Sequence, residues 1–296
     1  MEQFVAFSPK DIDECDKIIT DIITKIVSEN DKLKNNRHFS KMLLNEAILT
    51  GRALFDQNQN SDFEILYREK KFGNSGDLPP LEILTDNGTA KIAGKIDRID
   101  QYEDYVRIID YKSGKISSNA SEIFQDIYSG NNLQLLLYMK AVQNGLNKKP
   151  FASLYFPINN DFQTLKRPRF CMQGLVSDEL KAVLAADKKL NFDNLKSEAL
   201  PVSIKSVSGQ GLEVGNSSSV LSAEEFENTL NYSVSLTKNA IEEISSGYFE
   251  PSPCEGSCKW CDYKGVCCQP YENERDFSNI EIKKNIIARL GQNEKE

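Results

Sequence analysis

The spacing of apolar residues divides the chain into helical and extended stretches. Apolar positions recur every three or four residues along 8–28, 37–58, 131–144, 176–191 and 222–246, which predicts amphipathic helices. Between 62 and 113 the period falls to two, and strands are predicted over 63–71, 81–86, 90–100 and 104–112. Two further strands are predicted over 151–158 and 169–175. We therefore expect a mixed α/β fold with a central mixed β-sheet flanked by helices.

Local signals mark where several elements begin and end. The first helix has a cap signal at Ser8, and the last long helix has a capping box formed by Ser222 and Glu225. The Ser-, Gly- and Val-rich stretch 200–220 is predicted to be a loop. The last residues, 278–296, are predicted to form a short amphipathic helix and a charged tail.

These patterns predict five segments along the chain. They are a helical segment over 1–60, the sheet-containing core over 61–200, a loop and helix that pack on the core over 201–247, a cysteine-rich segment over 248–270, and a helix and tail over 271–296.

Composition and charge narrow the class of protein. The 296 residues are 40% hydrophobic and 27% charged, which is ordinary for a globular domain. No apolar run approaches the ~20 residues that span a bilayer, and the N-terminus lacks a signal peptide pattern, so we expect a cytoplasmic protein without a membrane partner. The net charge of −8 argues against a broad basic surface for DNA, but it leaves room for a local basic groove or a partner subunit that holds DNA.

The segment GKIDRIDQYEDYVRIIDYKSGK carries the candidate chemistry. Asp97 lies on one predicted strand and Asp110 on the next, so an antiparallel twisted pair can bring both carboxylates to one end. These oxygens and the backbone carbonyl of Tyr111 suit Mg²⁺ or Mn²⁺, which lowers the pKa of bound water and neutralises charge on a phosphate. Lys112 falls on the same strand face as Asp110, where its ammonium can stabilise developing charge.

Three other residues are weaker candidates. Gln134 and Tyr138 lie four apart on one predicted helix face, where they can orient a water or phosphate, but taken alone the pair is better explained by amphipathic packing. Glu69, on a predicted strand, is either a further acid of the site or a solvated strand residue.

The order GKIDRID, IIDYKSG and QLLLY resembles the PD-(D/E)XK nuclease superfamily, and more narrowly its RecB-type domains. The resemblance implies a restriction-endonuclease-like core. It also implies that Asp97 and Asp110 are metal ligands, Lys112 is the catalytic lysine, and Gln134 with Tyr138 form the motif after the site.

Five of seven cysteines crowd into fifteen residues, which in a reducing compartment indicates metal binding. Cys258, Cys261 and Cys267 resemble the C-terminal part of the iron–sulfur staple of AddB-type nuclease domains. That resemblance implies a [4Fe–4S] cluster whose fourth cysteine lies far upstream, and hence a chain that begins after that cysteine and after a metal-binding histidine helix. Cys254 and Cys268 remain alternative fourth ligands, and zinc remains an alternative to iron and sulfur.

Two residues outside these motifs have simpler interpretations. The only histidine, His38, is expected at the surface or in packing, and Cys15 falls on the apolar stripe of its helix as a core cysteine.

The resemblance implies a magnesium-dependent (exo)deoxyribonuclease module of a helicase–nuclease for double-strand-break processing and recombinational repair. Its partners would be DNA, an AddA-like subunit and an upstream helicase-like part of the same protein. No G-x₄-G-K-[ST] loop is present, so this chain has no recognisable ATP site. The alternative is a non-catalytic nucleic-acid-binding or scaffold module with a metal staple. A redox carrier is disfavoured, because no second cluster or flavin motif occurs.

Overall fold

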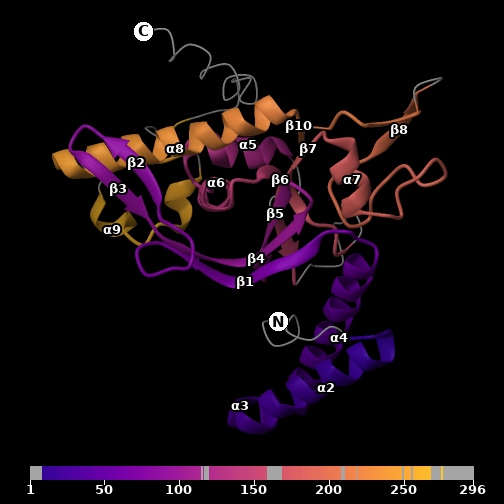
Figure 1. The fold of residues 1–296 in the computed structure, drawn as a ribbon. Helices are drawn as coiled ribbons and strands as arrows, with labels where there is room; N and C mark the ends of the chain where they lie inside the picture. The colour runs from indigo at the N-terminus through magenta and orange to yellow at the C-terminus, as the bar shows by residue number, and fades with distance from the viewer. Residues whose placement is uncertain are drawn as a thin grey trace.

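A mixed β-sheet lies between two layers of helices, and a helical hairpin extends away from it (Figure 1). The structure is a computed structural model that describes residues 9–114, 116, 120–158, 169–207, 211–217, 219–248, 250–254, 256–267 and 275. The predicted C-terminal helix over 278–296 lies outside the described residues.

The main sheet has six strands within the described ranges, in the order β1-β4-β5-β6-β7-β10. Their bounds are β1 Glu64–Phe72, β4 Gly94–Tyr102, β5 Tyr105–Lys112, β6 Lys149–Pro157, β7 Gln173–Ser177 and β10 Val220–Leu221. Strands β1, β4 and β5 pair antiparallel, as do β6 and β7, whereas β5–β6 and β7–β10 are parallel. The prediction of a mixed sheet is therefore confirmed.

Each face of the sheet has its own helices. Helices α5 (Ala120–Ser129), α6 (Gln134–Leu146) and α8 (Ala223–Ser246) cover one face. Helix α7 (Leu180–Ala186) and the C-terminal end of α4 (Arg37–Gln59) cover the other. The central strand β5 is buried on both faces, which explains its continuous apolar run.

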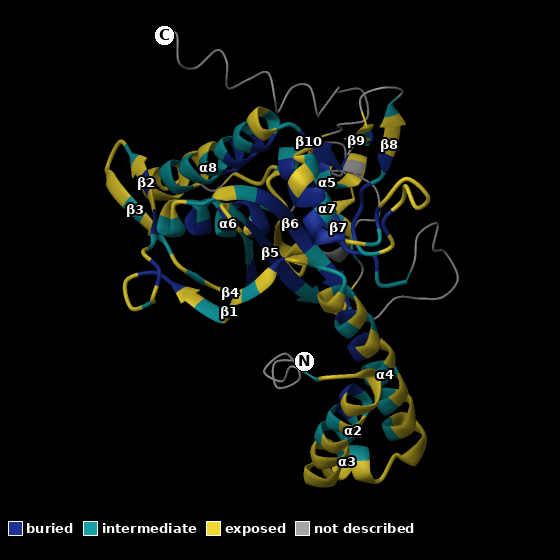
Figure 2. Cartoon of the chain, turned by 45° about the vertical axis from the view of Figure 1, so that its right-hand side comes forward, coloured by how far each residue is buried: buried dark blue, intermediate teal, exposed yellow. Residues whose placement is uncertain are grey.

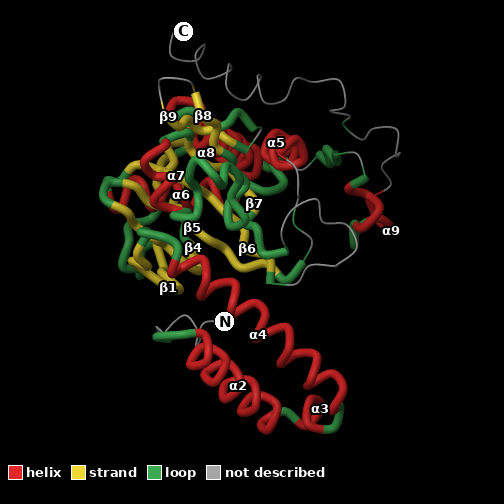
Figure 3. Tube along the Cα trace, turned by 90° about the vertical axis from the view of Figure 1, so that its right-hand side faces the viewer, coloured by secondary structure: helices red, strands yellow, loops and turns green. Residues whose placement is uncertain are grey.

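The helical hairpin is built from α2 (Ile12–Glu29) and α4, joined by the short α3 (Asp31–Lys34). Figure 3 shows α2 and α4 side by side, leading away from the sheet. Cys15 and Ile19 of α2 are buried against the core beside α4, so the expectation that Cys15 is a core residue is confirmed. His38 is exposed, as expected of a surface histidine.

Several boundaries differ from the sequence prediction. Asp11, not Ser8, caps α2: its side chain accepts a hydrogen bond from the N–H of Glu14 at 2.8 Å. The single strand predicted over 90–100 is broken at Ala93 into β3 (Gly88–Ile92) and β4, because β3 pairs with β2 (Leu81–Thr85) in a separate ribbon. Helix α7 is shorter than the helix predicted over 176–191.

The predicted loop over 200–220 was wrong. It contains β8 (Ile204–Val207) and β9 (Gly211–Val214), which pair antiparallel, and the beginning of β10. These strands are short, so periodicity did not distinguish them from a loop. Helices α3 and α5 were also missed. The capping box of α8 was predicted correctly, because both hydrogen bonds between Ser222 and Glu225 are present.

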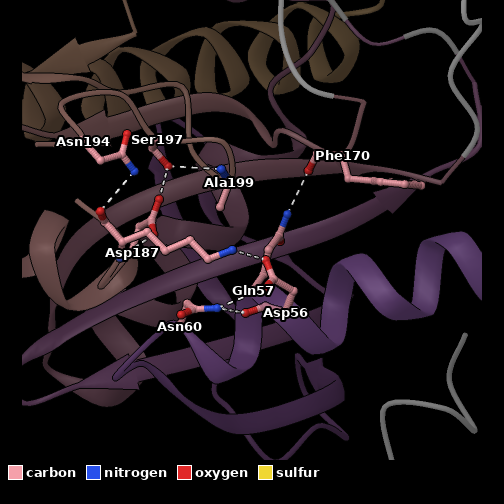
Figure 4. A network of polar contacts seen from close by, with 9 residues as sticks. Asp56, Gln57, Asn60, Phe170, Asp187, Asn194, Ser197 and Ala199 are labelled. Atoms are coloured by element: carbon pink, nitrogen blue, oxygen red, sulfur yellow. Dashed lines mark hydrogen bonds and ion pairs between the residues drawn. The ribbon is translucent and has the colours of Figure 1, made fainter. Parts of the chain in front are cut away.

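Burial is concentrated in the sheet and the helix faces turned toward it (Figure 2). A group of polar contacts ties the C-terminal end of α4 to neighbouring segments of the core (Figure 4). Gln57 Nε2 donates to the Phe170 carbonyl at 2.9 Å, before β7, and Lys189 Nζ, after α7, donates to Asp56 Oδ2 at 2.5 Å. Residues of these three segments line a cavity of about 180 Å³.

The cysteine segment forms two short helical turns, η1 (Ser257–Trp260) and α9 (Lys264–Cys267). Across the part of the chain that the structure describes, no helix has the length and apolarity needed to cross a membrane.

Candidate active site

The two candidate carboxylates lie where β4 and β5 separate. The last paired residues of these strands at this end are Arg98 and Ile109, so Asp97 and Asp110 stand opposite each other one step further on. There the N–H of Tyr111 donates to Asp97 Oδ2 at 2.9 Å. The side chain of Asp97 thus takes a main-chain donor of β5 and is fixed beside Asp110.

Asp110 is buried and close to Lys112 on the same strand. The Lys112 Nζ lies 2.8 Å from Asp110 Oδ2, while 39% of the lysine side chain is exposed and 10% of the aspartate side chain. Apart from this ion pair, the carboxylate oxygen has no hydrogen-bond partner among the described residues. An oxygen whose partner is a partly exposed ammonium keeps lone pairs that a further cation can use.

Several charges act on Asp97. Burial raises the pKa of its carboxyl, and the charges of Asp110 and Glu69 raise it further. The N–H of Tyr111 and the charge of Lys112 oppose this and lower the pKa. The carboxylates therefore repel one another in a partly buried environment, and a bound divalent cation would reduce that repulsion.

Glu69 lies beside this pair from the neighbouring strand. The register Arg68–Arg98 and Lys70–Ile96 places it opposite Asp97. Its φ of 52° is in the left-handed region, which is costly for a residue with a Cβ. Its carboxylate forms an ion pair with Lys95. Glu69 was expected to be either a further acid of the site or a solvated strand residue. Its place beside Asp97 is compatible with the first, and its catalytic role stays a prediction.

Tyr155 was missed by the sequence analysis. It pairs with Asp110 in the β5–β6 register, and Lys112 Nζ lies 5.3 Å from the centroid of its ring. Burial, with the charges of Asp110 and Asp126, raises the pKa of Tyr155 to about 12. Its phenol is thus a neutral donor at the site. The strand FASLYFPI was predicted, but only its parallel pairing with β5 shows that Tyr155 faces the carboxylates.

A buried ion cluster behind the site was also missed. Asp100 Oδ1 and Oδ2 accept from Arg98 Nε at 2.6 Å and Nη2 at 2.8 Å, and Oδ2 also accepts from Arg107 Nε at 2.9 Å. All three residues are at most 2% exposed. Arg98 also donates to Asn58 at 2.8 Å, which links β4 to helix α4. This cluster positions the strands that carry the carboxylates.

The structure gives the two residues of the predicted helix motif different surroundings. Gln134 is exposed at the first position of α6. The ring of Tyr138 packs edge-on against Phe72, with centroids 5.2 Å apart. It also covers Gly94, three residues before Asp97: a Cβ at Gly94 would lie 2.8 Å from the Tyr138 hydroxyl. Packing against β4 therefore accounts for the position of Tyr138, and a catalytic role for either residue stays a prediction.

The carboxylate pair fits a divalent cation. Asp97 and Asp110 offer oxygens at opposed positions, and the Asp110 oxygen that is paired with Lys112 accepts no other hydrogen bond from the described residues. Mg²⁺ commonly uses one or two carboxylates and keeps several waters. No group of three or more His, Cys, Asp or Glu side chains is arranged to hold a metal in the described ranges, so such a site would rest on two carboxylates. The carbonyl of Tyr111 as a further ligand stays a prediction.

The three staple cysteines are accessible. Cys258 is half-buried, and Cys261 and Cys267 are exposed. They do not form a gathered ligand set among the described residues. Cys254 is buried, and its sulfur accepts a hydrogen bond from Arg275 Nη2 at 3.3 Å, while Cys268 lies outside the described residues.

A mixed sheet flanked by helices, with Asp97 on one strand and the D-x-K sequence of Asp110 and Lys112 on the next, is consistent with a restriction-endonuclease-like fold. The chain belongs to the PD-(D/E)XK nuclease superfamily, whose family model matches residues 1–268. It is similar to an ATP-dependent helicase/deoxyribonuclease subunit of Clostridioides difficile (strain 630), at 31% identity over 91% of this chain and 25% of the relative. It is also similar to subunits of the same description from Bacillus thuringiensis (strain Al Hakam), at 30% over 86% and 24%, and Alkaliphilus metalliredigens (strain QYMF), at 28% over 79% and 22%. The chain thus spans about a quarter of the length of these relatives.

Proposed function

We propose that this chain is the nuclease module of a helicase–nuclease and hydrolyses phosphodiester bonds of DNA at Asp97, Asp110 and Lys112. The observation that carries the proposal is the opposed carboxylate pair at the separated ends of β4 and β5, with the Lys112 ammonium 2.8 Å from Asp110. The relatives are described as helicase/deoxyribonuclease subunits, which supports DNA as the substrate.

Each residue has a proposed task. Asp97 and Asp110 would hold Mg²⁺ or Mn²⁺, and a bound ion would activate water and neutralise charge on the phosphate. Lys112, partly exposed, would contact the phosphate as negative charge develops on its oxygens. The ring of Tyr155 would orient this lysine, and its phenol would donate a hydrogen bond to the substrate.

We also propose the wider setting that the similarity suggests. The module would act with a partner subunit and with helicase-like domains in processing double-strand breaks for recombinational repair. Cys258, Cys261 and Cys267 would be ligands of a [4Fe–4S] cluster completed by a cysteine from elsewhere. This cluster proposal is supported by the C-x₂-C-x₅-C spacing of the three cysteines and by their partial or full exposure.

The test is magnesium-dependent cleavage of end-labelled single- and double-stranded DNA by the wild type and three variants. Asp110→Asn keeps the shape of the side chain and should abolish cleavage. Lys112→Ala should lower the rate about 10²–10³-fold, as removal of a transition-state donor does. Glu82→Gln, on an exposed hairpin strand, is the matched control and should cleave normally.

Excess EDTA should stop cleavage by the wild type. Wild-type rates for Asp110→Asn would place the metal elsewhere and refute the assignment. If the wild type binds DNA but never cleaves it, while circular dichroism shows a folded protein, the non-catalytic binding module is the correct interpretation.

A further inference from the structure

A cavity of about 110 Å³ opens directly beside the proposed reaction centre. Lys112 and Tyr155 stand at its border with the carboxylate pair, so the cavity and the site share two residues. Its walls are mostly aliphatic and come from α5, α6 and β7. They include Ile123, Ile127, Leu135, Leu136 and Leu175.

One polar group faces these apolar walls without a partner. Ser153 on β6 is 2% exposed and lines the cavity, and its Oγ has no hydrogen bond within the described part of the chain. A hydroxyl buried in this way destabilises the folded protein, because it has lost its hydrogen bonds to water without replacing them. A hydroxyl both donates and accepts, so a ligand edge of either kind would satisfy it.

Glycine is required where β7 borders the cavity. Gly174 of β7 lines the cavity with a φ of +146°, and a Cβ there would lie 2.1 Å from the Ser153 carbonyl oxygen of β6. Only glycine therefore lets β7 lie this close to β6 at the wall that carries Ser153. At the rim, Asn132 Nδ2 donates to Asp126 Oδ2 at 2.9 Å, which adds polar groups at the entrance.

We propose that this cavity receives one nucleobase of a single DNA strand, from the nucleotide next to the phosphate that Lys112 contacts. This proposal rests on the proposed nuclease function. Unstacked bases are recognised by aromatic and apolar walls with a few hydrogen-bonding groups, and Tyr155, the aliphatic walls and Ser153 supply both. Because Lys112 borders both spaces, a base and its adjoining phosphate would occupy them together.

The proposal has a consequence for the substrate. A base enters the cavity only after leaving its stack and its partner strand, so the site acts on single strands or frayed ends. The lone hydroxyl of Ser153 accepts from or donates to any base, so little base preference is expected.

The experiment uses short, end-labelled single-stranded oligonucleotides, either intact or with one abasic nucleotide at successive positions. Cleavage is mapped at single-nucleotide resolution with Mg²⁺. For the wild type, an abasic nucleotide beside the cleaved bond should reduce cleavage about tenfold, which corresponds to ~1.4 kcal/mol. Abasic nucleotides further away should have little effect.

Ser153→Val fills part of the cavity and removes the unpaired hydroxyl. It should cleave the intact strand as slowly as the wild type cleaves the abasic one, with no further loss on the abasic strand. Its melting temperature should equal or exceed that of the wild type, which separates this result from misfolding. Ala199→Val is the matched control, because Ala199, labelled in Figure 4, lines the other cavity; this variant should cleave both substrates as fast as the wild type does.

Binding of the same oligonucleotides in EDTA, followed by fluorescence anisotropy, tests the cavity independently of cleavage. Tighter binding of the intact strand by the wild type, lost in Ser153→Val, supports the base pocket even if no variant cleaves, in which case only the nuclease proposal fails. Equal cleavage and equal binding of intact and abasic strands by the wild type would overturn the pocket while leaving the nuclease proposal standing.

Discussion

Replacing Gly94 with alanine should disturb the packing of α6 on β4, and with it the position of Asp97. A Cβ at this position would lie 2.8 Å from Phe72 Cε1 and from Cε1 and the hydroxyl of Tyr138. Ordinary contacts between carbon atoms are about 3.5–4.0 Å, so the rings or β4 must shift by roughly 0.7 Å or more. Phe72 is only 2% exposed and cannot retreat easily.

The expected magnitude follows from two opposing effects. Overpacking a well-packed position costs about 1–3 kcal/mol, while replacing glycine in an ordinary backbone conformation gains about 0.4–1 kcal/mol from the unfolded chain. A net loss of about 1–2 kcal/mol in the free energy of unfolding should result. Because Asp97 is three residues further along β4, its carboxylate should move as well, and cleavage should fall at least about tenfold.

Urea unfolding followed by circular dichroism measures the stability, and magnesium-dependent cleavage measures the site. Gly265→Ala is the matched control, because its Cβ would meet nothing within 4 Å. Removing the ring in Gly94→Ala/Tyr138→Ala should recover part of the loss, with a coupling energy of at least about 0.5 kcal/mol. Wild-type stability for Gly94→Ala, or strict additivity in the double variant, would refute the packing argument.

Two further predictions concern the buried charges and the cysteines. Asp100→Asn leaves the guanidinium groups of Arg98 and Arg107 buried without their counter-charge, so the free energy of unfolding in urea should fall by about 3–5 kcal/mol. The control Asp104→Asn, at an exposed ion pair, should lower it by less than about 1 kcal/mol. A loss below about 1 kcal/mol for Asp100→Asn would mean that water reaches the guanidinium groups. The anaerobically purified chain should contain substoichiometric iron and acid-labile sulfide, because the described residues assemble no full ligand set. Cys15→Ser should not change that content, since burial raises the pKa of the Cys15 thiol to about 11 and keeps it from ionising. A full, oxygen-stable cluster would show instead that a cysteine of this chain completes the set.

Sequence patterns predicted the elements whose signals are local. The alternation along 90–112 placed Asp97 and Asp110 on adjacent strands, as β4 and β5 confirm. The capping box at Ser222 and the apolar stripe through Cys15 were predicted correctly for the same reason. Each of these signals depends on residues two to four positions apart, where one local geometry is strongly favoured.

Other features depend on partners distant in sequence. Tyr155 and Ser153 face the site only because β6 pairs parallel with β5 across two helices, and no periodicity within 151–158 determines that choice. The place of Glu69 opposite Asp97 follows from the β1–β4 register. The short strands β8 and β9 bury little apolar surface by themselves, so their pairing depends on the surrounding packing.

The sequence by itself thus determined which side chains carry the candidate chemistry and that two of them lie on neighbouring strands. The tertiary structure alone decided what surrounds them: the Asp100 ion cluster behind, Tyr138 packed over Gly94, and the cavity beside Lys112. The physical reason is that chemistry and local geometry are set by the residues and their near neighbours. Burial, electrostatic environment and cavity shape arise only where strands and helices from distant parts of the chain meet.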